Sequence, residues 1–130
     1  MTVTGEPVTG ERLLTAFIRD YPREMGLTDE DPEAILDRYL APDFVFRNYG
    51  VPVDRRRMLG QARPARRNTL DVETEIHEML LDGPRFAARY TTRPTTRKGG
   101  TLEIHVLMFG ELAEDGRIRR VDQITHTGRA

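Results

Sequence analysis

The sequence contains no cysteine. This absence excludes a disulfide framework, a thiolate nucleophile and a zinc site with sulfur ligands. The longest apolar run, residues 106–109, has four residues, far fewer than the roughly 20 that a helix needs to cross a bilayer. Glycine-rich phosphate loops and metal-binding histidine spacings are also missing, so we expect neither a nucleotide cofactor nor a metal. The first residues lack the pattern of a secretory signal, and we therefore expect a cytoplasmic protein without membrane contact.

An excess of charge of one sign is missing too. The 130 residues carry 20 basic and 21 acidic side chains, for a net charge of −1, which argues against a nucleic-acid-binding protein. Apolar residues make up 38% of the chain and charged residues 32%, an ordinary globular balance. The length suits one domain. We expect that domain to span residues 1–130, with residues 1–8 as a flexible tail.

Three segments have the apolar spacing or the start signals of helices. In the first, residues 10–21, apolar side chains recur along one helical stripe, and Pro22 ends it. The second begins at Asp31-Pro32-Glu33, where an acid caps the helix and proline takes its first position. The third begins at Asp54, and Pro64 closes or kinks it.

Strands dominate the second half of the chain. A short strand at residues 44–46 precedes the third helix, and four β-rich runs separated by turn sequences follow from residue 69 onward. The order is therefore α-α-β-α-β-β-β-β. It predicts an α+β fold with helices packed on one face of a curved antiparallel sheet. The four runs are residues 69–81, 84–93, 101–112 and 117–126.

The run at residues 102–109 is apolar on both faces over its second half. Successive strand side chains point to opposite faces, and Leu107 and Phe109 alternate there with the equally apolar Val106 and Met108. One face has to cover the helices. Because so small a sheet usually has no second covering layer, we expect the other face to form a homodimer interface.

The element order and two motifs resemble the NTF2-like superfamily. The motifs are Pro42-Asp43-Phe44-Val45-Phe46, after the second helix, and Asp115-Gly116-Arg117-Ile118, at the start of the last strand. Within the superfamily the chain is most similar to the SnoaL-like polyketide cyclases and their ketosteroid isomerase relatives. The resemblance implies a cone whose open mouth holds a small hydrophobic molecule. It does not imply one reaction, because the fold hosts cyclisation, isomerisation, epoxide hydrolysis and plain binding.

The resemblance also implies a catalytic pair. His105 falls on the strand position of the cyclases' catalytic histidine. Their partner aspartate lies seven residues after the turn glycine, where this chain has Gln123, with Asp122 one residue earlier. A β-bulge would bring Asp122 into the cavity, and without one Gln123 takes its place. Apolar neighbours favour an uncharged His105, which can remove a proton next to a carbonyl group.

Further residues are expected to bind substrate. Asn48 or a tyrosine hydroxyl can donate a hydrogen bond to an enolate, and Arg89 suits a carbonyl or anionic group. Phe17 lies near the position of the isomerases' tyrosine donor. Asn48, Arg89 and, approximately, Asp122 also match the epoxide-hydrolase-type members, whose second acid is replaced by Thr91. The expected substrate-binding set is Phe17, Asn48, Tyr49, Arg89, Tyr90 and Gln123.

Each of these residues has a structural alternative. His105 can lie at a dimer interface, Asp122 can pair with Arg120 on the surface, and Asn48 can serve the turn before Gly50. Six arginines make the third helix basic, and a solvated surface is the default interpretation of that helix. Nucleic-acid binding is a second interpretation, which the lack of interleaved aromatic residues and the slightly acidic net charge disfavour. A docking patch for an acidic carrier protein is the third. These arginines are Arg55, Arg56, Arg57, Arg63, Arg66 and Arg67.

Together these features predict a cofactor-free enzyme of the SnoaL-like type. It would carry out general acid–base chemistry, such as aldol-type cyclisation or isomerisation, on a hydrophobic carbonyl compound. The 19 arginines against the single Lys98 suggest a GC-rich genome, in keeping with bacterial biosynthesis. The alternatives are a non-catalytic module that binds a hydrophobic ligand or dimerises, and an epoxide-hydrolase-like member.

Overall fold

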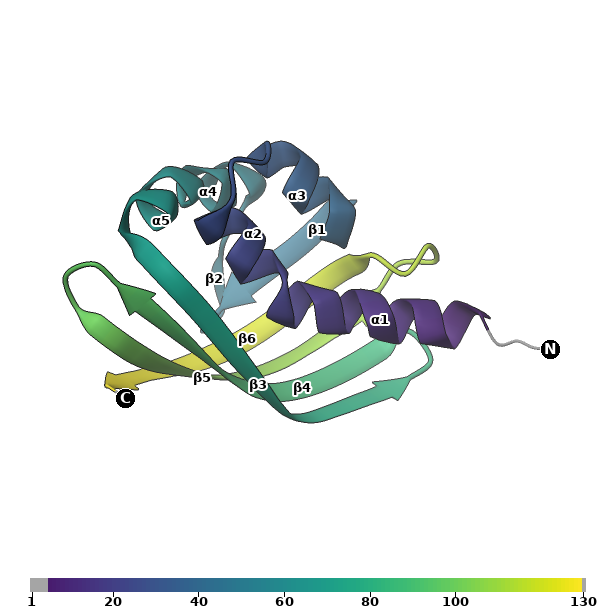
Figure 1. Cartoon of the computed structure of the whole chain (residues 1–130). Helices are drawn as coiled ribbons and strands as arrows, with labels where there is room; N and C mark the ends of the chain where they lie inside the picture. Colours follow the sequence, from purple (N-terminus) through teal and green to yellow (C-terminus); the bar gives the residue numbers. More distant parts are fainter. Residues whose placement is uncertain (1–4, 130) are drawn as a thin grey trace.

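A computed structural model of the chain describes residues 5–129. Helices lie on one side of a curved six-stranded sheet (Figure 1), which confirms the predicted α+β fold. The elements are α1 (Gly5–Arg19), α2 (Tyr21–Leu27), α3 (Pro32–Tyr39), β1 (Leu40–Asn48), β2 (Val51–Pro52), α4 (Arg55–Gly60), α5 (Ala62–Asn68), β3 (Thr69–Asp82), β4 (Arg85–Thr96), β5 (Gly100–Leu112) and β6 (Ile118–Arg129).

The helices differ from the prediction at two prolines. Pro22 does not end the helical region, because it occupies the first turn of α2, where its missing N–H costs no hydrogen bond. Pro64 likewise lies in the first turn of α5, so the third expected helix is split in two. The start of the second expected helix is confirmed, since the Asp31 carboxylate accepts a hydrogen bond from the Glu33 backbone N–H.

Helix α1 begins earlier than predicted. It takes in residues 5–8 of the expected tail, and residues 1–4 of that tail lie outside the described residues. Within residues 5–129, no helix is long and apolar enough to cross a membrane.

The sheet order is β2-β1-β6-β5-β4-β3. The four predicted strands in the second half of the chain are confirmed, and β3 to β6 pair in sequence as antiparallel neighbours. The sheet is nevertheless mixed, because β1 runs parallel to β6. A tight turn connects β1 to β2, and its residues Tyr49 and Gly50 have φ angles of 53° and 78°, as two-residue hairpin turns require.

The core lies between the helices and the face of the sheet that they cover, which we call the inner face. Leu14, Ile18, Ile35 and Leu36 come from the helices and are at most 1% exposed. They pack with strand side chains of the inner face, and this burial of apolar surface is the main stabilising contribution to the fold. The strand residues of the core include Phe86, Ala88, Tyr90, Val106, Met108 and Val121.

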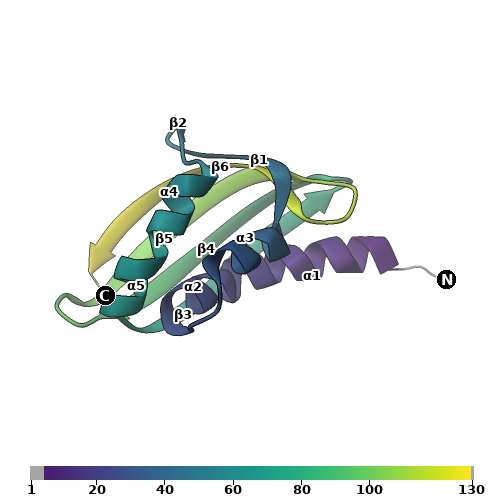
Figure 2. The ribbon, with the colours of Figure 1, turned by 90° about the horizontal axis from the view of Figure 1, so that it is seen from above.

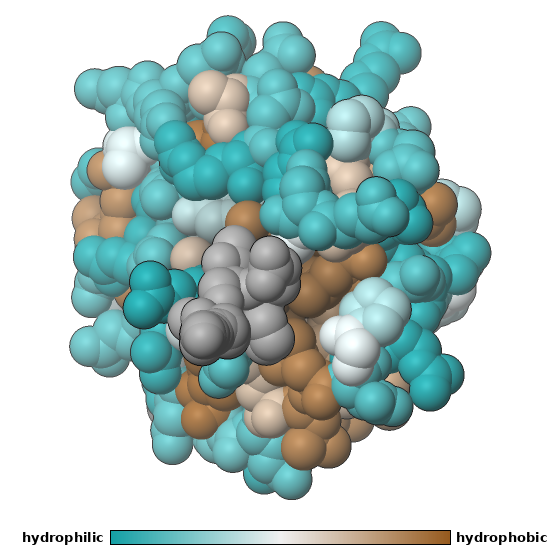
Figure 3. Space-filling view, turned by 90° about the vertical axis from the view of Figure 1, so that its right-hand side faces the viewer, coloured by the Kyte–Doolittle hydropathy of each residue, from teal (hydrophilic) through white to brown (hydrophobic). Residues whose placement is uncertain are grey.

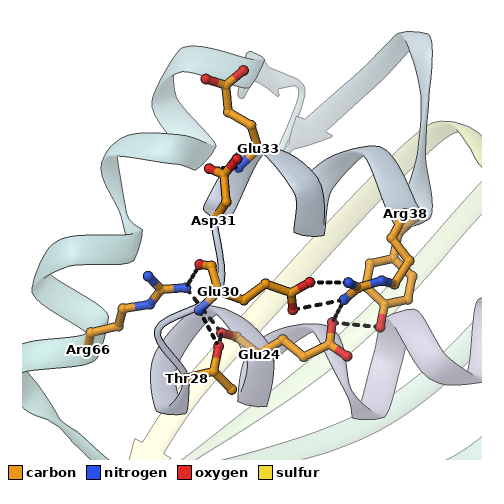
Figure 4. A network of polar contacts seen from close by, with 8 residues as sticks. Glu24, Thr28, Glu30, Asp31, Glu33, Arg38 and Arg66 are labelled. Carbon is orange, nitrogen blue, oxygen red and sulfur yellow. Dashed lines mark hydrogen bonds and ion pairs between the residues drawn. The ribbon is translucent and has the colours of Figure 1, made fainter.

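A polar network fastens α2, α3 and α5 to one another (Figure 4). The Glu24 carboxylate accepts hydrogen bonds from Arg38 and from the Tyr39 hydroxyl, both at 2.8 Å. Arg66 of α5 donates to the backbone carbonyls of Met25 and Glu30 at 3.1 and 2.6 Å. The Met25 carbonyl lies in the last turn of α2, where carbonyls have no partner within the helix, so Arg66 supplies it with a donor.

Gly110 of β5 is the position where the sheet tolerates no side chain. A Cβ there would lie 2.1 Å from the Arg120 backbone oxygen and 2.3 Å from the Phe86 ring. We expect Gly110→Ala to lower the free energy of unfolding by about 3 kcal/mol or more, measured by urea denaturation. Gly60→Ala is the control, because a Cβ at Gly60 meets nothing within 4 Å. Equal stability of the two variants would contradict this packing.

Candidate functional site

Strand register decides which side chains can meet in this fold. Tyr90 of β4 pairs with Val106 of β5, and both are buried in the core, so their side chains mark the inner face. Met108 follows on the same face and pairs with Gln123 of β6, which in turn pairs with Asn48 of β1. Tyr90, Gln123 and Asn48 therefore project from three strands toward the helices.

These side chains line a cavity of about 230 Å³ between the inner face and the helices. Helices α1, α2 and α4 contribute lining residues from the other side. Its apolar lining consists of Phe17, Pro22, Phe46, Val53 and Met58, and its polar lining consists of Tyr21, Asn48, Gln61, Tyr90 and Gln123. The lining therefore has no residue that is charged at neutral pH.

Asn48 carries an unsatisfied polar atom at this cavity. Its side-chain oxygen Oδ1 is buried and has no hydrogen-bond partner among the described residues. Burial of an amide group without a partner costs roughly 1–3 kcal/mol in proteins. A ligand with a hydroxyl or N–H group would supply the missing donor.

Two tyrosine hydroxyls add hydrogen-bond donors to the cavity. Burial raises the pKa of Tyr21 to about 12 and raises the pKa of Tyr90 still further. Both phenols therefore stay protonated at neutral pH. A protonated phenol can donate to a ligand carbonyl, and it cannot act as a base at that pH.

Four of the residues expected to bind substrate line this cavity: Phe17, Asn48, Tyr90 and Gln123. Among the polar and aromatic residues of the lining, sequence reasoning missed Tyr21, Phe46 and Gln61. The first two had a signal, since Tyr21 lies one helical turn after Phe17 and Phe46 lies two strand residues before Asn48. Nothing local marked Gln61, which caps the break between α4 and α5.

His105 lies on the opposite, outer face of the sheet. Its Nδ1 is 2.9 Å from the hydroxyl of buried Thr91, and that hydroxyl is also 2.8 Å from Nε2 of His77. Its Nε2 lies 3.4 Å from the Glu103 carboxylate, and half of the side chain is exposed. The ring also stacks on His126. The expected position on the cavity wall is therefore wrong, because His105 directly precedes the inward-facing Val106 and successive strand side chains point to opposite faces.

Asp122 also points outward, and the expected pairing with His105 is not present. Arg47 and Arg120 each donate to its carboxylate at 2.6 Å, which is the surface pairing considered as its structural alternative. Asp122 pairs across the strands with Phe109, four residues along β5 from His105, a separation of about 13 Å.

A β-bulge determines which of Asp122 and Gln123 faces the cavity. Leu112 pairs with Ile118 and Glu111 pairs with Arg120, so Arg119 is an extra residue in β6. Regular alternation from the buried Ile118 would have turned Asp122 inward. The extra residue reverses the alternation and places Gln123 at the cavity instead, so the expectation that a bulge would bring Asp122 inward is wrong.

Two other expected substrate-binding residues lie away from the cavity. Arg89 is on the outer face, bonded to Glu78 at 2.9 Å. Tyr49 is 62% exposed in the β1–β2 turn, with its hydroxyl on the Thr125 carbonyl. Asn48 therefore faces the cavity while Arg89 and Asp122 face outward, so the set expected for an epoxide-hydrolase-like site does not converge.

Comparison with known proteins agrees with this architecture. Residues 18–121 match the SnoaL-like domain family. No curated protein matches the chain in sequence. A proposed hydroxylase, AclR from Streptomyces galilaeus, superposes with a TM-score of 0.69 at 14% identity, covering 92% of this chain and 76% of that one.

Two further solved structures are similar to this chain. IdmH, a proposed polyketide cyclase from Streptomyces antibioticus, has a TM-score of 0.65 and 19% identity, covering 89% of this chain and 91% of IdmH. An epoxide hydrolase of the LEH type from M. tuberculosis has a TM-score of 0.62 and 22% identity, covering 92% of this chain and 84% of that one. At these identities the likeness shows a shared fold.

The arginine pair around Asp122 predicts an acid-sensitive contribution to stability. Hydrogen bonds from Arg47, and then from Arg120, hold the pKa of Asp122 below its ordinary value. The stabilisation is therefore complete above the pKa of an unfolded aspartate, about 3.9, and is lost as the pH falls through the lower folded value. Asp122→Asn should lower the melting temperature at neutral pH, and its difference from wild type should shrink below about pH 4.

Thermal melts across this pH range measure the effect. Asp29→Asn is the control, because Asp29 makes no side-chain hydrogen bond or ion pair within residues 5–129. A difference between Asp122→Asn and wild type that stays constant with pH would contradict the assigned ion pairs.

Proposed function

Because the chain belongs to the SnoaL-like family of the NTF2-like superfamily, we propose that its cavity binds a small uncharged compound carrying carbonyl and hydroxyl groups. The observation that carries this proposal is the neutral lining around the unpaired Asn48 oxygen. Apolar side chains supply contact area, while amides and phenols fix the orientation of the ligand. The volume is below the roughly 300 Å³ at which pockets for drug-sized ligands begin, so the ligand has one or two rings.

Binding is better supported than proton abstraction by the cavity itself. An aldol-type closure needs a base to hold the proton taken from carbon, and the lining offers phenols and amides in that place. His105, the base implied by the resemblance, is bonded to Thr91 on the other face of the sheet.

A second candidate function is ring closure by addition of a substrate hydroxyl to a carbonyl of the same molecule. A C–O bond forms, the π bond of the carbonyl breaks, and the hydroxyl proton passes to the carbonyl oxygen, so the step needs no protein base. The protonated Tyr90 hydroxyl favours it, because a buried donor stabilises negative charge that develops on a carbonyl oxygen. The cavity would also hold the two ends of one substrate molecule together. In this case turnover depends on Tyr90, so Tyr90→Phe should slow it while His105→Gln leaves it unchanged.

A pair of ligands with the same shape and different charge tests the binding proposal. An acetylnaphthol carries a hydroxyl and a neutral carbonyl, and the corresponding hydroxynaphthoate carries a carboxylate. Calorimetric titration should give at least about tenfold tighter binding of the neutral compound, because the cavity offers no charge to pair with a carboxylate. Equal or tighter binding of the hydroxynaphthoate would refute the proposal.

Two variants link that binding to the cavity. Asn48→Leu should weaken binding of the acetylnaphthol about fivefold, the loss of one hydrogen bond, without lowering the melting temperature. His105→Gln is the matched control and should leave binding unchanged. If His105→Gln weakened it more than Asn48→Leu, the ligand would lie on the outer face.

We also propose that the outer face of the sheet forms a homodimer. Leu80 and Phe109 are 68% and 65% exposed, and Leu107 and Ile124 are each 47% exposed. Two hollows of about 570 and 180 Å³ share Leu80, Ala87 and Phe109 as lining residues. Figure 3 views the molecule from the side where α1 begins and shows apolar side chains reaching the surface among polar ones. A contiguous apolar patch of this kind is typical of an association surface.

Sedimentation velocity tests the dimer. The wild-type chain should sediment as a dimer, and Phe109→Glu should convert it to a monomer, because a carboxylate at the centre of an apolar interface stays unpaired. Val51→Glu is the control, since Val51 is also exposed but lies on the edge strand β2. A wild-type monomer, or a dimer that both variants leave intact, would contradict this interface.

A further inference from the structure

Positive charge is concentrated on α4 and α5. Residues 54–68 contain six arginines and one acidic residue, Asp54, while the whole chain has a net charge of −1. The remainder of the molecule therefore carries excess negative charge. Such a separation of charge on one surface steers partners of opposite charge toward it.

Two of these arginines are occupied within the fold. Arg55 contacts the carboxylates of Asp37 and Glu33 at 2.9 and 3.5 Å. The Arg66 side chain donates hydrogen bonds to the backbone carbonyls of Met25 and Glu30 (Figure 4).

The other four arginines are exposed and have no ion-pair partner within residues 5–129: Arg56, Arg57, Arg63 and Arg67. The β4–β5 turn extends this surface, because the Arg97 side chain donates to the Arg67 carbonyl at 2.7 Å and the neighbouring Lys98 is exposed. In Figure 2, α4 and α5 follow one another across the sheet, and the turn lies beside the end of α5. We call these six cations the basic stripe.

The basic stripe borders the proposed ligand cavity. Met58 of α4 and Gln61, at the junction of α4 and α5, line that cavity, while their neighbours Arg57 and Arg63 belong to the stripe. The two helices thus have one side toward the ligand and another toward solvent. A partner bound along the stripe would lie next to the cavity wall.

We propose that the basic stripe docks an acidic protein surface. Helices α4 and α5 together extend over about 20 Å, which is far longer than one phosphate group and matches a helix or strand of a partner. A nucleic acid is a poorer match, because residues 54–68 and 97–100 contain no aromatic side chain on which bases could stack. The negative charge of the remaining surface also repels a phosphate backbone.

Fluorescence anisotropy with a labelled Glu-rich helical peptide tests the docking at low salt, about 50 mM NaCl. Replacing four stripe arginines by glutamine should weaken binding at least about tenfold, since exposed rim charges dominate such an encounter. The same four positions changed to lysine should restore most of it. The positions are Arg56, Arg57, Arg63 and Arg67.

The matched control replaces four arginines on other surfaces by glutamine, so the net charge changes by the same amount as in the stripe variant. It should leave peptide binding within about twofold of wild type, and circular dichroism should show wild-type melting for every variant. The control positions are Arg12, Arg19, Arg85 and Arg119, all exposed.

Several outcomes would overturn the proposal. These are no peptide binding by the wild type, equal weakening in the control variant, tighter binding of oligothymidylate than of the peptide, and full competition by inorganic phosphate. The link to the cavity rests on the proposed function, whereas the docking assay contains no cavity ligand. The assays can therefore show that docking fails while the acetylnaphthol still binds. They can also show that the peptide docks while the acetylnaphthol does not bind.

Discussion

The alternation of side chains along β4, β5 and β6 is the constraint on which the rest of the molecule depends. Val106, Met108 and Val121 are buried against the helices, so a shift of one residue in any of these strands would expose the core. This fixes every other residue on the same strands to one of two faces. Tyr90 and Gln123 project toward the helices, and His105 and Asp122 project away from them.

As a result, side chains of different chemical character lie on different surfaces of the molecule. The inner cavity holds amides, phenols and apolar side chains, while the Asp122 carboxylate and the His105 imidazole are hydrogen-bonded on the outer face. Recognition in the cavity therefore depends on shape and hydrogen bonding. The proposed dimer interface on the outer face and the proposed docking at the basic stripe involve other surfaces, so the three proposed activities can coexist on one chain of 130 residues.

Local sequence signals predicted most of the fold. The features that they missed depend on pairing between distant segments. The strands from residue 69 onward and the cap at Asp31 were predictable, because turn glycines and a capping acid act within a few residues. The parallel pairing of β1 with β6 joins segments more than 70 residues apart, so no local pattern reveals it. Four of the six expected substrate-binding residues line the cavity. Asp122 and Arg89 do not, because the face of each depends on register rather than on residue type.

The extra residue Arg119 makes β6 tolerant of changes in length. Closing that bulge would absorb the loss of one residue beside it and leave Ile118 and Val121 both directed at the core. The central part of β5 has no such extra residue, since its pairing with β4 is regular from Thr92 to Arg85. Insertions and deletions accumulating over evolutionary time should therefore be found at the beginning of the last strand and be rare in the strand before it.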